Sequence, residues 1–348
     1  MEQFDYRKIL PTLMIPEIVS SLGAVREHRG KQRLYTVIKP DALNSLEKVA
    51  RIQSTGASNR IENISTSNKR LHELMNDKTE PRNRDEREIA GYRFVLDMIH
   101  ERHDAIPVKP NTILQLHRDL YRFSDASHAG TWKDADNVIA ERNADGALVA
   151  RFRPTSAAGT PFAMERLCTE YNEQIANGVY DPILVSLLFT FDFVSIHPFN
   201  DGNGRMSRLL TLLLLYRNDY TVGKYISLEK EIEQTKSTYY EALAASSIGW
   251  QDGNSDYAPF VTYMLGIVIA CYKELDKRIF QLSSSSNEET LRTYFENIIG
   301  PVSKREIMDA NPSMSQRTVE RMLQKLQAEG MIEKVGAARA TAYRRTDS

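Results

Sequence analysis

The chain has 348 residues, enough for about two domains around a sizeable buried core. Its 45 basic and 46 acidic residues give a formal net charge of -1, which excludes recruitment of nucleic acid or anionic membrane by a global positive field. The two cysteines, Cys168 and Cys271, lie far apart and lack metal-ligand spacing, so we expect buried thiols in a reducing compartment.

The N-terminal segment has acidic residues among its first five positions and no sustained apolar core, so it does not read as a signal peptide. Its prolines, Pro11, Pro16 and Pro40, predict an extended arm over the first forty residues. The later apolar runs ILVSLLFTFDFV and LLTLLLLY are interrupted by Asp192 or shorter than the roughly 20 residues of a membrane span. We therefore expect a cytoplasmic protein with no membrane partner.

Helical periodicity dominates the next part of the chain and predicts a mostly α protein. Apolar residues recur every three or four positions in six segments: 43–53, 89–103, 112–123, 164–178, 183–196 and 205–218. Residues 130–153 differ, because the short apolar runs NVIA and ALVARF flank Asn143, Asp145 and Gly146. Apolar runs around such a turn cluster predict a β-hairpin.

A change in composition at residues 281–287, QLSSSSN, predicts a solvated linker and a domain boundary after the long apolar segment 257–280. Beyond it, three short helices and a terminal hairpin are expected at 290–300, 303–311, 315–330, 331–336 and 340–345. This arrangement over residues 287–348 resembles a winged helix-turn-helix domain, whose third helix commonly enters the DNA major groove.

The stretch HPFNDGNGRMSR, residues 197–208, concentrates polar groups that suit phosphate chemistry. Gly202, Asn203 and Gly204 precede an apolar helical run, so they form a turn at a helix N-terminus, where anions are favoured. Arg205 and Arg208 lie three apart on that helix and can both meet phosphate oxygens.

Two further side chains of the stretch complete the chemistry. Asp201 offers Mg²⁺ a carboxylate while phosphates supply more of its ligands, although it can also cap the following helix. His197, at the end of the preceding helix, can take a proton from an attacking hydroxyl near neutral pH. The chain has no Gly-Lys-Ser/Thr P-loop, so the residues predict nucleotidyl or phosphoryl transfer to a hydroxyl by another type of enzyme.

Residues 197–208 match the signature of the Fic (filamentation induced by cAMP) family throughout, and roughly residues 40–270 resemble it. The resemblance implies transfer of AMP from ATP to a hydroxyl side chain of a target protein, and to the enzyme itself. It implies His197 as the general base, Phe199 as the anchor of the loop in the core, Asp201 as the Mg²⁺ ligand and Gly202, Asn203 and Gly204 as the anion hole. Arg205 and Arg208 would bind the outer phosphates, with Arg208 at the γ-phosphate.

The resemblance also implies that the hairpin at 130–153 is the family's flap, which holds the target by strand pairing through Val138 and Ile139. Trp132 and Lys133 stand where many relatives have tyrosine and arginine. Tyr239 and Tyr240 match a tyrosine pair of the nucleotide pocket and are equally compatible with core aromatics. Ser247 replaces an expected asparagine near the adenine.

SNRIEN, residues 58–63, matches the family's inhibitory pattern of Ser or Thr, three free positions, Glu, and Gly or Asn. Ser58 and Glu62 are four apart and share a helix face, so Glu62 can pair with Arg208 and compete with the γ-phosphate. The expected organisation is an N-terminal arm and helical region at 1–110, containing this motif with Asn63, a Fic catalytic domain at 111–280, and a winged helix at 287–348.

Other functions stay open from sequence. Arg317, Arg321 and Lys325 recur every four residues on the third C-terminal helix, and Arg339, Arg344 and Arg345 follow in the wing. They fit a DNA-binding regulator with a Fic sensor domain, but nearby glutamates make docking of a protein, or of a second copy as a homodimer, an equal alternative. Removal of AMP, with Glu62 positioning water, is a third. The remaining histidines lack paired ligand spacing and are interpreted as surface or packing residues: His28, His72, His100, His103, His117 and His128.

Overall fold

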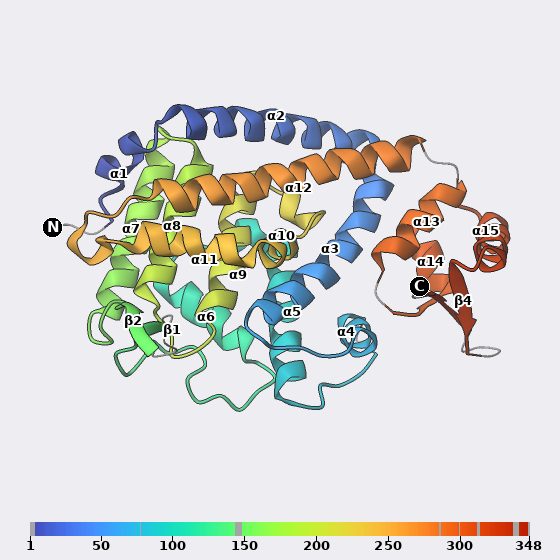
Figure 1. The fold of residues 1–348 in the computed structure, drawn as a ribbon, viewed down its shortest axis with the longest axis horizontal. Helices are drawn as coiled ribbons and strands as arrows, with labels where there is room; N and C mark the ends of the chain where they lie inside the picture. Colours follow the sequence, from blue (N-terminus) through green and yellow to red (C-terminus); the bar gives the residue numbers. More distant parts are fainter. Residues whose placement is uncertain are drawn as a thin grey trace.

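The computed structural model describes residues 4–76, 78–142, 148–284, 287–298, 300–311, 314–336 and 341–346. Most of them are helical, which confirms the predicted fold class, and they form a long helical body with a smaller unit at one end (Figure 1). The helices of the body are α1 (Tyr6–Thr12), α2 (Pro16–Ile38), α3 (Pro40–Ile61), α4 (Asn68–Met75), α5 (Arg84–Arg102), α6 (Pro110–Leu120), α7 (Thr160–Asn177), α8 (Pro182–Ile196), α9 (Asn203–Arg217), α10 (Leu228–Gln234), α11 (Lys236–Ser247) and α12 (Ala258–Ser284). Short 3-10 helices follow α5, α9 and α11 at His103–Ala105, Val222–Lys224 and Trp250–Asp252.

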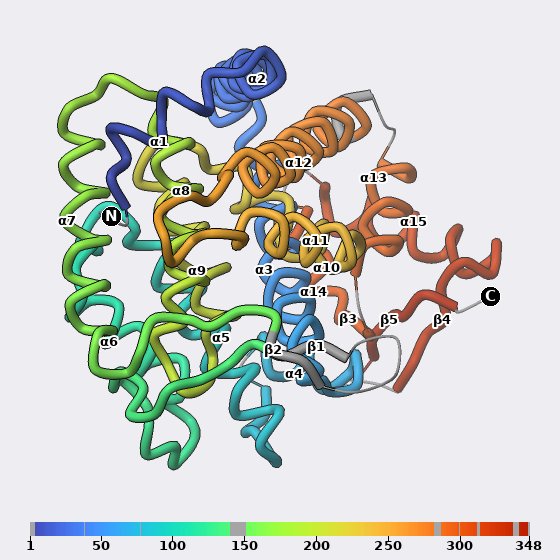
Figure 2. Tube along the Cα trace, turned by 60° about the vertical axis from the view of Figure 1, so that its left-hand side comes forward, coloured from blue at the N-terminus to red at the C-terminus, as the bar shows by residue number. Residues whose placement is uncertain are grey.

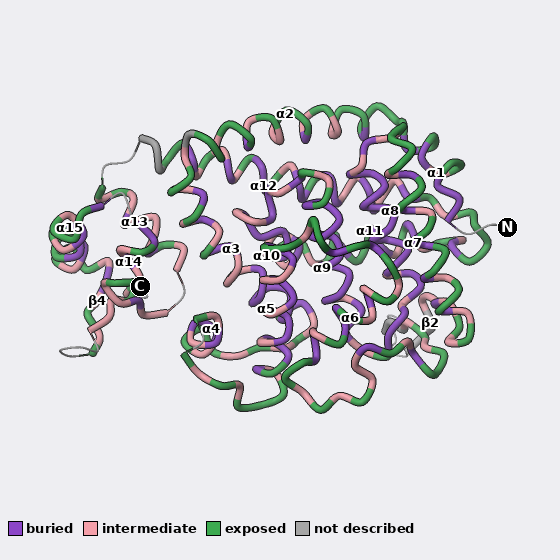
Figure 3. The backbone as a smooth tube through the Cα atoms, turned by 180° about the vertical axis from the view of Figure 1, so that it is seen from behind, coloured by how far each residue is buried: buried purple, intermediate pink, exposed green. Residues whose placement is uncertain are grey.

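α8 and α9 form the centre of the body. α8 is apolar on all sides and almost entirely buried, as expected for a helix enclosed by others. It contacts α7, α9 and α12, while α9 also contacts α3 and α5. Figure 3 shows the buried residues concentrated in this central part of the body. The loop between the two helices, residues 197–202, is therefore anchored in the core at both ends.

The first forty residues are helical from Tyr6 onward, so the extended arm predicted from their prolines is wrong. Pro16 and Pro40 each occupy the first position of a helix, where the missing N–H has no intrahelical partner to lose. α2 lies alongside α12 over one face of the body (Figure 1). These prolines therefore mark helix starts.

α12 is long and apolar enough to span a membrane by composition, and α1 and α2 pass the same test only when taken together across a 94° bend. Half of the apolar window of α12 is buried inside the protein, where it packs against α2, α10 and α11. α12 also continues to Ser284, so the linker expected from Gln281 begins later. Serine is only moderately unfavourable in a helix, and a long packed helix extends through it.

The predicted hairpin is present as strands β1 (Ile139–Arg142) and β2 (Leu148–Phe152), which pair antiparallel with a register shift after Ile139. Val138 is exposed just before β1, and Ile139 is half-buried within it. The predicted turn residues Asn143, Asp145 and Gly146 lie outside the described residues.

The smaller unit, residues 287–346, is called the C-terminal unit below. It contains α13 (Asn287–Asn297), β3 (Val302–Ser303), α14 (Lys304–Ala310), α15 (Gln316–Ala328), β4 (Ile332–Val335) and β5 (Ala342–Arg345). The antiparallel sheet has the order β3-β5-β4, and the short strand β3 was not predicted. A separate apolar cluster around Phe295, Val319 and Leu323 forms its core. The predicted wing residue Arg339 lies outside the described residues.

Figures 1 and 2 place the C-terminal unit beside the end of α12 and next to α3, with α14 contacting α3 directly. Lys48 of α3 donates to the Asp309 carbonyl over 3.1 Å, and Ser45 donates to the Ala310 carbonyl. The helix that carries Ser58 and Glu62 at its far end is therefore the one on which the C-terminal unit rests.

Candidate active site

His197 is placed by the end of α8. It is the C-cap residue, with φ 53° and ψ 61° in the left-handed region, and its N–H donates to the Phe193 carbonyl over 3.1 Å. Burial, and then the charge of Lys133, lowers the pKa of His197 to about 4. The imidazole is therefore neutral at pH 7 and able to accept a proton. Its Nδ1 is buried and makes no hydrogen bond among the described residues.

The turn after His197 is folded by its own side chains. Gly202 is the N-cap of α9 with φ 81°, a conformation that favours glycine, and its N–H donates to Asp201 Oδ1 over 2.7 Å. The Asn203 amide is buried and bonds both ways with the Phe199 backbone, accepting over 2.9 Å and donating over 2.8 Å. Phe199 is fully buried against the parallel His117 ring, with centroids 3.7 Å apart. Asn203 therefore shapes the loop with its side chain.

Arg205 is fully buried. Its Nη1 lies 2.7 Å from Glu88 Oε2 in an ion pair, and its Nη2 donates to the Tyr121 hydroxyl over 2.9 Å. Glu88 also accepts from Arg84 Nε over 2.7 Å. The guanidinium thus has a carboxylate partner from α5, and the binding of an outer phosphate by Arg205 stays a prediction.

Arg208 faces the end of α3. Its Nε donates to Ser58 Oγ over 2.8 Å, and its Nη2 donates to the Ser58 carbonyl and to Glu62 Oε1, each over 2.9 Å. Glu62 is the C-cap of α3, and Asn63 follows with φ 61°. Asparagine and glycine tolerate this left-handed conformation. This explains why the last position of the inhibitory pattern, Asn63 in this chain, is Gly or Asn. The structure thus brings together the two predicted motifs, whose contacting residues lie 146 and 150 positions apart in sequence.

A cavity of about 240 Å³ opens over the turn and is lined by eleven residues, Glu62, Ile64, Arg84, Glu88, His197, Asn200, Asp201, Gly202, Asn203, Gly204 and Arg205. Glu62 Oε1 lies only 2.0 Å from the position that a Cβ on Gly204 would take. The Glu62 carboxylate therefore rests directly on the glycine turn.

Asp201 lies at the edge of this cavity with its side chain nearly half exposed. Burial raises the pKa of Asp201, but the Arg205 charge and the Gly202 N–H outweigh it and leave the pKa below its usual value. The described residues contain no group of three His, Cys, Asp or Glu side chains that could hold a metal. An ionised Asp201 fits the type of Mg²⁺ site in which the protein supplies one carboxylate, and phosphates and water supply the remaining ligands.

Comparisons with known proteins match this site to one family. Residues 107–215 match the model of the Fic/DOC family. This part of the chain is a Fic domain. The chain is 28% identical to the protein adenylyltransferase fic-1 of Caenorhabditis elegans over 178 residues, half of this chain and 30% of that protein. It is 30% identical to the protein adenylyltransferase Fic of Drosophila grimshawi over 152 residues, 44% of this chain and 27% of that protein. It therefore spans less than a third of the length of these curated relatives.

Solved structures share the fold of the Fic domain and of more of the chain. A Fic family protein from Desulfovibrio desulfuricans superposes with a TM-score of 0.62 at 23% identity, over 96% of this chain and 97% of that one. A Fic domain containing signaling protein from Bacteroides thetaiotaomicron gives a TM-score of 0.62 at 24% identity, over 73% of this chain and 97% of that one. The first likeness takes in nearly the whole chain.

Tyr239 and Tyr240 flank the Fic domain on α11. Tyr239 is buried close enough to Arg208 for that charge to act on it, whereas Tyr240 is exposed, and their ring centroids are 5.4 Å apart. Ser247 ends α11 and donates to the Ala244 carbonyl over 2.9 Å. The tyrosine pair thus has one member in the core and one facing solvent, and its part in nucleotide binding stays a prediction.

Several residues around the Fic motif were missed by sequence reasoning. His117, interpreted as a surface or packing residue, is fully buried and its Nε2 lies 3.1 Å from the Asp201 carbonyl. Its Nδ1 accepts from the Gly130 N–H over 2.9 Å, which assigns the proton to Nε2. Glu88 and Lys133 also reach the site. Each contact joins distant parts of the chain, and no local spacing signals it.

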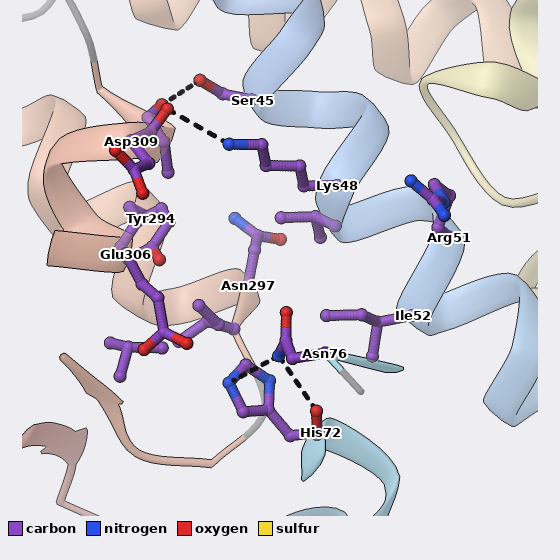
Figure 4. A pocket seen from close by; sticks show the side chains of 14 residues that line it. Ser45, Lys48, Arg51, Ile52, His72, Asn76, Tyr294, Asn297, Glu306 and Asp309 are labelled. Carbon is purple, nitrogen blue, oxygen red and sulfur yellow. Dashed lines mark hydrogen bonds between the residues drawn. The ribbon is translucent and has the colours of Figure 1, made fainter. Parts of the chain in front are cut away.

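A second cavity, of about 290 Å³, lies between α3, α4 and the C-terminal unit (Figure 4). Lys48, Arg51 and His72 line it from the body, and Asn297 and Glu306 from the C-terminal unit. It shares no lining residue with the cavity at His197. The two cavities are therefore separate.

Proposed function

We propose that the chain is a protein adenylyltransferase that transfers AMP from ATP to a hydroxyl side chain of a target protein. The observation that carries this proposal is that His197 lines the same cavity as the glycine turn at the N-terminus of α9, the helix that also contains Arg208. The names of the C. elegans and D. grimshawi relatives support it.

In the proposed reaction the target hydroxyl attacks the α-phosphorus of ATP. A new oxygen–phosphorus bond forms, the bond to the pyrophosphate oxygen breaks, and the hydroxyl proton passes to His197. The backbone N–H groups at the start of α9 and the Arg208 guanidinium stabilise the phosphates. Asp201 would hold Mg²⁺, which neutralises phosphate charge when bound. Val138 and Ile139, at the start of the hairpin, are the proposed contacts for target backbone.

We infer further that Glu62 inhibits this reaction. Its carboxylate pairs with Arg208 and rests on Gly204, so a γ-phosphate has to displace it from both. A nucleotide that binds without displacing Glu62 lacks its Arg208 contact and leaves its α-phosphate out of line with the attacking hydroxyl. Inhibition is thus built into the same chain.

The test is intact mass after incubation with Mg²⁺ and each nucleoside triphosphate in turn, with wild type, Glu62→Gly and Glu62→Gly/His197→Ala. We expect Glu62→Gly to gain one or more AMP groups from ATP and the His197→Ala double variant to gain none. If Glu62→Gly gains no nucleotide, alone or with candidate target proteins, the proposed activity is wrong.

AMP removal is the second candidate function, favoured by the one-third exposure of the Glu62 side chain at the cavity that His197 also lines. A carboxylate in this position can activate water as a base. Wild type should then release AMP from a modified target that Glu62→Gly leaves modified. Equal retention of AMP with both proteins would exclude this function.

For the C-terminal unit we propose nucleic acid as the partner to test first. Arg317 and Arg321 are exposed on α15 and have no carboxylate partner among the described residues. Lys325 and Arg344, in contrast, pair with Glu288 and Glu333. A gel shift of the full chain that weakens with salt and with Arg317→Ala/Arg321→Ala supports DNA binding. Unchanged mobility in low salt would favour protein docking or a homodimer.

The free, buried thiols Cys168 and Cys271 support our placement of the protein in the cytoplasm.

A further inference from the structure

Lys133 is a buried lysine next to the Fic motif. It precedes the hairpin, and only 3% of its surface is exposed, although lysine is among the residue types that are least often buried. Its backbone N–H donates to the Pro198 carbonyl over 2.9 Å. Its Nζ donates to the Ile196 carbonyl over 3.1 Å and to Asn137 Oδ1 over 3.0 Å. The side chain and the backbone of Lys133 thus donate hydrogen bonds to the residues on both sides of His197.

These two hydrogen bonds flank an unfavourable backbone conformation. His197 is a non-glycine residue at φ 53°, an unfavourable conformation that persists only where the surroundings enforce it. Ile196 is the last residue of α8, so its carbonyl has no intrahelical partner, and the Lys133 ammonium supplies one. Lys133 therefore holds the carbonyl groups of the residues before and after the left-handed residue.

The same ammonium sets the electrostatics of the imidazole. The C-terminal end of a helix is partially negative and favours a protonated histidine, and the carboxylates of Glu62 and Asp201 act in the same direction. Burial and the Lys133 charge act against protonation and prevail. Burial lowers the pKa of Lys133 to about 8 while Asp136 opposes this change, so the ammonium is mostly charged at neutral pH.

We propose that Lys133 is the positioning residue that holds His197 in its left-handed conformation and keeps the imidazole neutral and ready to accept a proton. The inference rests on the proposed function, in which His197 takes the hydroxyl proton during transfer. An imidazolium has no free lone pair for that proton, so loss of the Lys133 charge would leave His197 inactive over a wider acid range.

The experiment compares Lys133→Met, which keeps the length and removes the charge, with Lys133→Arg, which keeps the charge. Lys133→Gln removes the charge but keeps an N–H donor, and Lys224→Met is the control for losing a half-buried lysine elsewhere. The first measurement is the titration of His197 by NMR of histidine-labelled protein, with its signal assigned by its loss in His197→Ala. It needs no activity.

We expect the His197 titration midpoint to move upward in Lys133→Met and Lys133→Gln and to stay in place in Lys133→Arg and Lys224→Met. The acid limb of AMP incorporation, measured in the Glu62→Gly background, should move with it. A movement of about one pH unit makes transfer on that limb roughly tenfold slower. Rescue by Lys133→Arg at each pH separates the charge from general loss of structure.

An unchanged His197 titration in both folded neutral variants overturns the role assigned to Lys133, whatever the activity. If Lys133→Met does not fold, Lys133→Gln decides alone. If no variant incorporates AMP but the titration moves as expected, the proposed activity fails while the placement of Lys133 stands.

Discussion

Replacing Glu62 by glycine should speed AMP transfer strongly, because it removes the carboxylate that occupies Arg208 and the glycine turn. Two unit charges about 4 Å apart attract by about 4 kcal/mol at an effective dielectric constant of 20. A third of the Glu62 side chain is exposed, so solvent screening reduces this. A hydrogen bond between charged groups contributes about 1.5–3 kcal/mol. Because wild type has to displace Glu62 first, its AMP transfer should be slower than that of Glu62→Gly by a factor of roughly 10 to 100.

The assay is a time course of AMP incorporation at saturating Mg-ATP for wild type, Glu62→Gly, Glu62→Gln and Glu62→Gly/Arg208→Ala. Glu62→Gln keeps the size of the side chain without its charge and should fall between wild type and Glu62→Gly. Arg208→Ala should cancel the gain, because the freed arginine is what binds the phosphate. Glu233→Gln, at a carboxylate that pairs with the exposed Arg60, is the control and should behave as wild type. If Glu62→Gly melts at the wild-type temperature and transfers AMP no faster, Glu62 is not an inhibitor.

Three further changes test the site. His197→Ala should slow transfer by about 10²- to 10⁴-fold while ATP binding, measured by calorimetry, persists; undiminished incorporation would remove His197 as the base. Asp201→Ala should be very slow and should no longer respond to added Mg²⁺, and wild-type rates in magnesium would rule out its role. Buried His117 and partly buried His197 have pKa values of about 4, below the ordinary 6.5, so the unfolded chain binds more protons between these values. Their stabilisation is present above pH 6.5 and is lost as the pH falls to 4, by roughly 3 kcal/mol for each histidine. Thermal melts from pH 7 to 4 measure this loss, and it should be smaller in His117→Gln; an equal loss in that variant would contradict the reasoning.

Local patterns in the sequence predicted much of the fold. The apolar repeats at 183–196 and 205–218 coincide with α8 and α9 within two residues, because a helix that packs on its neighbours repeats its apolar positions within a few turns. The hairpin at 130–153 follows equally from short-range signals. A twelve-residue motif between two such helices then places His197 and the glycine turn at the end of one and the start of the next.

The errors in the predicted fold came from local sequence patterns that are compatible with two different structures. Pro16 and Pro40 can interrupt a chain or begin a helix, and only the packing of α2 along α12 decides for the helix. The serines after Gln281 suggested a linker, yet α12 extends to Ser284. In both cases the deciding contacts lie far away in sequence.

Long-range contacts at the candidate active site could not be predicted from the sequence either. Glu88, His117 and Lys133 act on the motif from positions 63 to 117 residues before the groups that they contact, and no spacing in the sequence links them to these groups. Ser58 and Glu62 were found because their spacing repeats a known pattern. Long-range partners without such a pattern can be assigned only from the fold.

The two arginines of the motif show why the fold changes the functional argument. Arg205 and Arg208 are one helical turn apart and equally buried, but their carboxylate partners differ in exposure: 3% for the Glu88 side chain and 33% for Glu62. Separating a buried ion pair leaves an uncompensated charge in the core, whereas a carboxylate at the open edge of a cavity can turn into water. Both carboxylates line the cavity, but Glu88 is fixed within α5, whereas Glu62 is the C-cap residue that follows the last residue of α3. We therefore propose Arg208 as the arginine that exchanges its carboxylate for a phosphate, with Arg205 holding the start of α9 against α5 through Glu88.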